Sequence, residues 1–195
     1  MAKKGLLIIL SGPSGVGKGT IRKLIIDRPE LNLAYSISMT TRKPRNREVD
    51  GLDYYFVDKK TFEDNIKKGN FLEYCEFVGN YYGTPLDKVN TIRETGKNVF
   101  LEIEINGAEQ VMAKTKGEDV VSIFLLPPSL KALEERIRKR KTESESVILQ
   151  RLKKARSEMN KNKNYDYTVV NDDADVAADK IAEIILEHIK LNELN

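Results

Sequence analysis

The chain has 195 residues, 40% hydrophobic and 32% charged, with a formal net charge of +3. This length favours one domain, the composition excludes a disordered chain, and the small charge gives no argument for nucleic acid. A single cysteine, Cys75, excludes an internal disulfide and a cysteine-rich zinc site, and no stretch approaches the roughly 20 apolar residues of a membrane helix. We therefore expect a cytoplasmic protein.

The first predicted element is a buried strand near 6–11, which leads into the glycine-rich sequence GPSGVGKGT at 12–20. A strand, a glycine-rich turn and a helix near 18–27 are typical of a phosphate-binding P-loop. Backbone N–H groups of such a loop converge on one anion, and the helix dipole and Lys18 add positive charge. The sequence departs from the usual pattern because Gly19 follows the lysine and the hydroxyl comes at Thr20. The alternative is an ordinary glycine-rich turn. It is disfavoured because the strand, the loop, the lysine and the helix follow one another at the spacing of a P-loop.

The segment 40–90 differs from the rest of the chain. Short strands at 54–57 and 71–74 flank a helix near 60–68, and Gly79-Asn80 predicts a turn. Elsewhere apolar strands alternate with amphipathic helices, which is typical of an α/β fold with a parallel sheet. Those strands are expected near 34–38, 97–104, 119–125 and 166–170, and those helices near 106–115, 129–140, 144–162 and 174–191. We interpret 40–90 as a small inserted α+β subdomain at the ligand-binding edge of the sheet.

A basic loop follows the second predicted strand and carries Arg42 and Arg45. Guanidinium groups suit bidentate contacts to phosphate, and Tyr54 offers a hydroxyl nearby in the sequence. Two arginines alone are more typical of a solvated surface loop.

A larger set of residues resembles the signature of the guanylate kinase family: Thr40, Thr41, Arg42, Arg45, Glu48, Gly51, Tyr54, Phe56 and Val57. Glu73, the segment 79–84 and the pair Asn171-Asp172 agree with that family, and the resemblance runs from about residue 6 to residue 188. It implies a three-layer α/β/α P-loop domain with a core of 1–38 and 91–195, a GMP-binding subdomain of 39–90 and a lid at about 136–160. The implied reaction is transfer of the γ-phosphoryl group of MgATP to GMP or dGMP, giving ADP and GDP.

The resemblance also implies the residues of the acceptor site. The GMP phosphate is assigned to Arg42, Arg45, Tyr54 and Tyr82, and the guanine edge to Ser38, Glu73, Thr84 and Glu104. Guanine presents two donor groups and one acceptor along this edge, which carboxylates and hydroxyls complement. Adenine reverses that polarity and would leave buried carboxylates unpaired. Taken singly, Glu73 reads equally well as a surface strand residue and Thr84 as a turn hydroxyl.

The donor site follows in the same way. ATP binding is assigned to Gly12, Pro13, Ser14, Gly15, Val16, Gly17, Lys18, Gly19, Thr20, Arg136 and Asn171. Glu102, at the position of a Walker B acid, and Thr20 are expected to hold Mg²⁺, largely through water because Mg²⁺ keeps much of its hydration shell. Catalytic roles are assigned to Lys18, Arg42, Arg140 and Arg151, whose charges stabilise the transferring phosphoryl group.

The basic cluster at 136–141 has a structural component as well. Glu134 and Arg138 have the spacing of a helical ion pair. Lys141 stands where many members of the family have glycine, and Cys75 is expected to pack in the core of the subdomain.

Three other functions remain open at this point: a scaffold that recognises phosphorylated peptides, a kinase for another nucleoside monophosphate, and nucleic-acid binding. The intact P-loop disfavours the first, the carboxylates Glu73 and Glu104 the second, and the lack of interleaved aromatics the third. The expected partners are therefore ATP and GMP, without nucleic acid or membrane, for a monomer or a homodimer.

Overall fold

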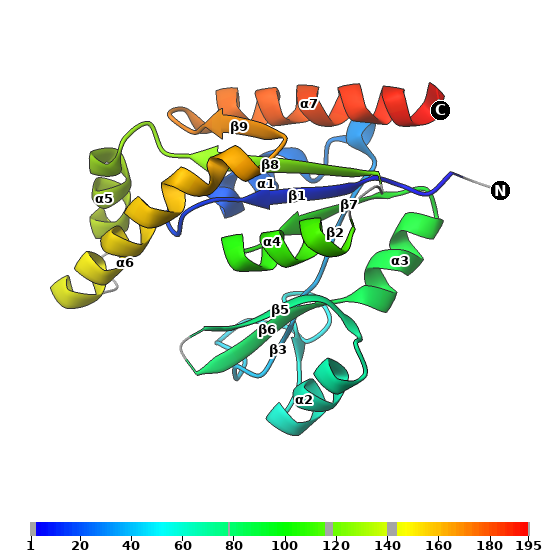
Figure 1. Cartoon of the computed structure of the whole chain (residues 1–195), viewed down its shortest axis with the longest axis horizontal. Helices are drawn as coiled ribbons and strands as arrows, with labels where there is room; N and C mark the ends of the chain where they lie inside the picture. Colours follow the sequence, from blue (N-terminus) through cyan, green and yellow to red (C-terminus); the bar gives the residue numbers. More distant parts are fainter. Residues whose placement is uncertain (1–2, 78, 116–118, 140–143, 195) are drawn as a thin grey trace.

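The computed structural model describes residues 3–77, 79–115, 119–139 and 144–194. Figure 1 shows a parallel sheet with helices on both faces, and a smaller sheet with its own helix beneath it. This arrangement confirms the expected α/β class with a central parallel sheet. Within the described residues, no helix is both long and apolar enough to cross a membrane.

The main sheet has the strand order β2-β7-β1-β8-β9, and each neighbouring pair is parallel. Its strands are β1 (Leu7–Ser11), β2 (Leu33–Tyr35), β7 (Asn98–Glu102), β8 (Val120–Leu126) and β9 (Tyr167–Val170). The central strand β1 is buried along its whole length, which explains its uninterrupted apolar sequence. Parallel strands place their carboxyl ends at one edge, so the segments that follow β1 and β7 lie together there.

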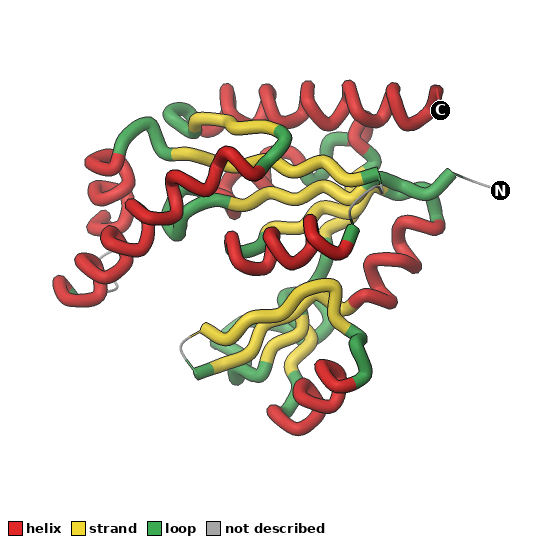
Figure 2. Tube along the Cα trace, in the orientation of Figure 1, coloured by secondary structure: helices red, strands yellow, loops and turns green. Residues whose placement is uncertain are grey.

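Helices cover the two faces of this sheet (Figure 2). One core cluster lies between the sheet and helices α1 (Lys18–Ile25) and α7 (Ala174–Leu194). A second lies on the other face, against α3 (Leu86–Glu94) and α4 (Ile105–Lys114). Helices α5 (Leu130–Lys139) and α6 (Glu145–Glu158) lie beside each other at the carboxyl edge, and Arg138 of α5 pairs with Glu134 at 2.8 Å, as the spacing predicts.

The smaller sheet has the order β4-β3-β6-β5 and is mixed. Its strands are β3 (Met39–Thr40), β4 (Tyr55–Phe56), β5 (Phe71–Phe77) and β6 (Asn80–Pro85), and helix α2 (Lys59–Lys67) packs against it. The ring of Phe62 on α2 is fully buried and stacks on Phe71 at 4.4 Å and on Tyr81 at 5.3 Å. Asp58 caps the helix by accepting a hydrogen bond from the Thr61 N–H at 2.7 Å.

Three elements were not anticipated: strands β3 and β6, and helix α3. Helix α3 buries only Val89 and Arg93, so its apolar periodicity is weak. Arg93 is buried because its Nε donates to the carbonyl oxygen of Gly5 at 2.7 Å, and the sequence gives no sign that this arginine points inward. The helix expected near 144–162 ends at Glu158 and continues as the 3₁₀ helix Met159–Asn164, while Pro29–Leu31 forms another 3₁₀ turn.

Candidate functional site

A cavity of about 290 Å³ lies between the two sheets, at the carboxyl end of β7. Both sheets and the start of α1 contribute to its wall. It is lined by Lys18, Tyr35, Ser38, Tyr54, Glu73, Cys75, Tyr82, Glu102, Ile103 and Glu104. Seven of these ten were expected as site residues from the sequence, and the fold brings them together from positions between 18 and 104.

The glycine-rich loop between β1 and α1 has the backbone of a P-loop. Gly17 precedes the helix with φ +109°, and a Cβ at this position would lie 2.5 Å from Asn171 Nδ2, so only glycine fits. The Lys18 ammonium bends back over the loop and donates to the Gly12 carbonyl oxygen at 2.8 Å. Burial lowers the pKa of Lys18, and the nearby carboxylates of Glu104 and Glu102 oppose that shift. The Gly12 carbonyl oxygen and these two carboxylates thus favour the charged form of Lys18 at the loop.

Distant segments close around this loop. Asn171, just after β9, donates from Nδ2 to the Val16 carbonyl oxygen at 2.8 Å, and Arg136 on α5 donates to the same oxygen at 3.3 Å. Arg151 on α6 donates from Nη2 to Ser14 Oγ at 2.7 Å. Arg136 and Asn171, which were expected at the ATP site, and Arg151, which was expected to be catalytic, therefore contact the loop.

Two positions of the basic cluster, Arg140 and Lys141, lie outside the described residues.

Glu102 ends strand β7 and lies against the start of α1. A Cβ at Gly19 would lie 3.5 Å from Glu102 Oε1, an ordinary contact, and Oε2 lies 3.2 Å from Arg22 Nε. The Arg22 guanidinium in turn lies 4.3 Å from the centre of the Tyr35 ring. Burial raises the pKa of Glu102. Thr20 is exposed, and among the described residues no three histidine, cysteine or acidic side chains converge as metal ligands.

The buried carboxylate of Glu73 faces the cavity from β5. Strand pairing places Thr84 opposite it, and Thr84 Oγ1 donates to Glu73 Oε1 at 2.6 Å. The other oxygen lies against Gly107 of α4, where a Cβ would be 2.6 Å from Oε2. Glu73 is 4% exposed, and burial raises its pKa to about 6. A carboxylate kept this dry is suited to accept hydrogen bonds from a ligand that enters the cavity.

The basic loop contributes Arg42, which Glu48 holds by an ion pair of 2.8 Å. The Arg42 guanidinium lies 5.4 Å from the centre of the Tyr54 ring, which contacts the Tyr82 ring edge-on at 6.1 Å. Arg45 has an exposed side chain and donates its backbone N–H to Glu48 Oε2 at 2.7 Å. The structure thus brings three of the four expected phosphate residues together and leaves the Arg45 side chain at the surface.

Sequence reasoning missed several residues near the cavity. Cys75 was expected in the core, but it lines the cavity because it lies two residues after Glu73 and so shares its face of β5. Burial raises the pKa of the Cys75 thiol to about 11, so it stays protonated. Lys154 on α6 lies 3.7 Å from Glu104 Oε2 and 3.4 Å from Glu158 Oε1, and nothing in the basic sequence of this helix singles it out.

Comparisons with known proteins agree on one family. A family model described as guanylate kinase matches residues 4–188. The chain is 54% identical to the guanylate kinase of Enterococcus faecalis over 100% of this chain and 95% of that one. It is 55% identical to the guanylate kinase of Lactiplantibacillus plantarum over 95% and 89%. Among solved structures, the guanylate kinase from Anaplasma phagocytophilum is similar, with a TM-score of 0.72 and 34% identity over 95% of this chain and 86% of that one.

Proposed function

The chain belongs to the guanylate kinase family, and from that premise we infer how it transfers the γ-phosphoryl group of ATP to GMP, giving ADP and GDP. We assign the donor to the P-loop and the acceptor to the cavity between the two sheets. The observation that carries this assignment is that Lys18 of the P-loop lines the same cavity as Glu73 and Glu104. A single cavity therefore joins a phosphate-binding loop to carboxylates that can read a base.

In the donor half, the backbone N–H groups of residues 12–20 and the Lys18 ammonium hold the β- and γ-phosphates of ATP. Arg136 and Asn171, both bonded to the Val16 carbonyl oxygen, lie beside the nucleotide. Arg151, together with Arg140, neutralises the charge that develops on the transferring phosphoryl group. These arginines belong to the segment 136–160, which we propose as the lid.

The residues at the end of β7 fit a magnesium ion that accompanies ATP. One carboxylate, Glu102, lies against the start of α1, where Thr20 also lies. One carboxylate and one hydroxyl are enough for Mg²⁺, because proteins bind this ion with one or two groups while phosphates and water supply its other ligands. Glu102 and Thr20 would hold it, and the ion would supply charge neutralisation on the phosphate oxygens.

In the acceptor half, we propose that residues 39–90 form the GMP-binding subdomain. Arg42, Tyr54 and Tyr82 bind the GMP phosphate, and Arg45 reaches it from the surface when the subdomain closes. Guanine is read by four side chains: Ser38, Glu73, Thr84 and Glu104. The carboxylates accept from N1–H and the N2 amino group, and a hydroxyl donates to O6. Because these contacts involve phosphate and base only, we propose dGMP as a second acceptor.

The reaction needs no side-chain base, because the acceptor phosphate is already anionic. One of its oxygens attacks the γ-phosphorus, and the bond from that phosphorus to the β–γ bridging oxygen breaks. The electron pair leaves with ADP. Catalysis comes from in-line positioning, neutralisation of charge and exclusion of water.

A coupled assay of ADP release tests this function, with GMP, dGMP, AMP, CMP and UMP offered in turn as acceptors. We expect GMP and dGMP to be phosphorylated and AMP to be at least about 10³-fold poorer in kcat/KM, because it leaves buried carboxylates unpaired. Preference for AMP, CMP or UMP would contradict the assignment of the guanine-reading residues.

A further inference from the structure

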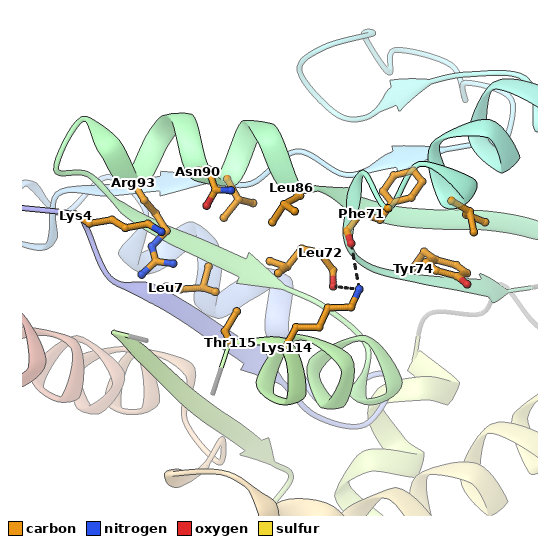
Figure 3. Close-up of a pocket in the computed structure, with 13 residues that line it drawn as sticks. Lys4, Leu7, Phe71, Leu72, Tyr74, Leu86, Asn90, Arg93, Lys114 and Thr115 are labelled. Atoms are coloured by element: carbon orange, nitrogen blue, oxygen red, sulfur yellow. Dashed lines mark hydrogen bonds between the residues drawn. The ribbon is translucent and has the colours of Figure 1, made fainter. Parts of the chain in front are cut away.

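Strand β5 lies at the edge of the smaller sheet, and side chains of α4 occupy its outer side. Gln110 pairs with the backbone of Tyr74: its Nε2 donates to the carbonyl oxygen at 2.9 Å and its Oε1 accepts from the N–H at 3.3 Å. The Lys114 ammonium donates to the carbonyl oxygens of Leu72 at 2.8 Å and Phe71 at 3.1 Å, as Figure 3 shows. A helix of the main body therefore supplies hydrogen-bond partners to the first part of this edge strand.

These contacts lie on both sides of Glu73. The β5–β6 register shifts between Phe71 and Glu73, so the strand ladder is irregular where this carboxylate begins. Lys114 binds the carbonyl groups at that irregularity, and Gln110 binds the next residue, Tyr74. Gly107, which closes on the Glu73 carboxylate, shares the same face of α4 because the three residues are spaced by three and four.

This part of β5 borders a hollow. The hollow measures about 520 Å³ and has Phe71, Leu72 and Lys114 in its wall (Figure 3). Phe71 and Leu72 are themselves buried, but the hollow beside them leaves part of the task of holding the strand to the hydrogen bonds. The contacts from Gln110 and Lys114 are therefore placed to fix the position of β5.

We propose that Gln110 and Lys114 are positioning residues for guanine recognition, which hold β5 so that Glu73 keeps its place against Thr84 and Gly107. The inference rests on the proposed role of Glu73 as a reader of the guanine edge. Lys114 has a second effect on Glu73, through its charge. The groups that act on the Glu73 carboxyl from packed elements are the Thr84 hydroxyl and backbone on β6 and the Lys114 ammonium on α4, and each lowers its pKa against the larger effect of burial.

Two variants separate position from charge. Lys114→Met removes the hydrogen bonds and the charge, whereas Gln110→Leu removes hydrogen bonds only. We expect both to raise KM for GMP by about tenfold or more, since displacements near 1 Å have effects of this order, with KM for ATP changed less than about twofold. In Lys114→Met alone, the acid limb of kcat/KM for GMP should also move to higher pH, because the variant loses a positive charge that lowers the pKa of Glu73.

Lys114→Arg keeps the charge and the donors and should restore KM for GMP to within about threefold of the parent protein. Lys60→Met, an exposed change on α2 of the same subdomain, is the matched control and should leave both constants unchanged.

The inference is overturned if Lys114→Met and Gln110→Leu keep the parent KM for GMP, or if KM for ATP rises as much. If Lys114→Met does not fold, Gln110→Leu and Lys114→Arg decide the question. Failure of the parent chain to phosphorylate GMP would instead refute the proposed function. Failure of the positioning inference can therefore be told apart from failure of the proposed function.

Discussion

At the scale of one residue, the proposed role of Glu73 in recognition conflicts with stability. Its carboxyl is 4% exposed and burial raises its pKa from 4.5 to about 6. A raised pKa means that the folded state binds the proton more tightly than the unfolded state does. The associated stability is fully present below about pH 4.5 and is lost as the pH rises through about 6. At neutral pH the ionised carboxylate thus destabilises the fold by about 2 kcal/mol relative to the protonated form.

Glu73→Gln should therefore stabilise the protein and disable recognition of GMP. The amide keeps an oxygen for Thr84 to donate to but carries no charge. We expect the free energy of unfolding in urea to rise by about 1–2 kcal/mol at pH 7.5, with a smaller gain at pH 5. KM for GMP should rise about 100-fold or more, because the amide N–H₂ group faces the guanine donors. Equal gains in stability at the two pH values would contradict burial of the charge as the cause.

The same titration predicts the pH dependence of GMP use. Below about pH 6 Glu73 is protonated in the free protein, so kcat/KM for GMP should fall about tenfold per pH unit. The phosphate monoester of GMP also gains a proton near pH 6 and contributes to this fall. The profile of Glu73→Gln isolates that contribution, and the parent profile should be steeper by one proton. Identical slopes for the two proteins would refute titration of Glu73 as a cause.

We expect Lys18 to matter more for turnover than for stability. Its ammonium is desolvated and bonded to the Gly12 carbonyl oxygen, so Lys18→Met should leave the melting temperature unchanged or higher. Turnover should fall by about 10³-fold, the order expected for a cation that stabilises a transferring phosphoryl group. Thermal melting and steady-state assays beside Lys60→Met measure both effects, and a turnover number near that of the parent chain would remove Lys18 from the site.

At the scale of elements, one position of helix α4 allows helix stability and the proposed recognition of GMP to be tested separately. Gly107 lies inside the helix, and a Cβ there would be 2.6 Å from Oε2 and 3.1 Å from the carboxyl carbon of Glu73. The atoms in conflict belong to the end of a side chain, so the fold can adapt while the carboxylate moves.

Gly107→Ala should therefore leave stability unchanged or raise it by up to about 1 kcal/mol, the gain of alanine over glycine in a helix. KM for GMP should rise about 10-fold to 100-fold through displacement of Glu73, while KM for ATP stays constant. Chemical unfolding and substrate kinetics measure the two effects on the same sample. A large loss of stability with normal KM for GMP would show that the glycine serves packing alone.

Elements with strong local patterns could be predicted from the sequence, and those set by distant partners could not. Strand β1 with its P-loop and helix α7 have clear apolar or glycine patterns, and both form as expected. Helix α3 was missed because its inward residue Arg93 finds its partner on Gly5, far away in the chain. Cys75 and Lys154 were missed as neighbours of the cavity because their place depends on the pairing of β5 and the docking of α6.

At the scale of the whole molecule, the two sheets share one hydrophobic cluster. Leu72 of β5 is 3% exposed and belongs to the same buried cluster as Leu7 and Ile9 of β1. The hydrogen bonds from α4 to β5 cross the same boundary. A joint that is packed and bonded in this way couples the stability of its two sides, so we expect both sheets to unfold in one transition.

The chain has no tryptophan, so one introduced residue reports on each sheet without background. Tyr81→Trp places the reporter in the smaller sheet and Tyr167→Trp places it in the main sheet, both at half-buried positions. In each protein, the urea midpoint of the fluorescence signal should coincide with the midpoint measured by far-UV circular dichroism. The midpoints reported by the two tryptophans should therefore agree to the same extent. Adding Leu72→Ala should lower the free energy of unfolding by about 2–5 kcal/mol, equally for both reporters, because the cavity opens in the shared cluster. An earlier midpoint for Tyr81→Trp, or a loss after Leu72→Ala confined to that reporter, would mean that the smaller sheet unfolds independently.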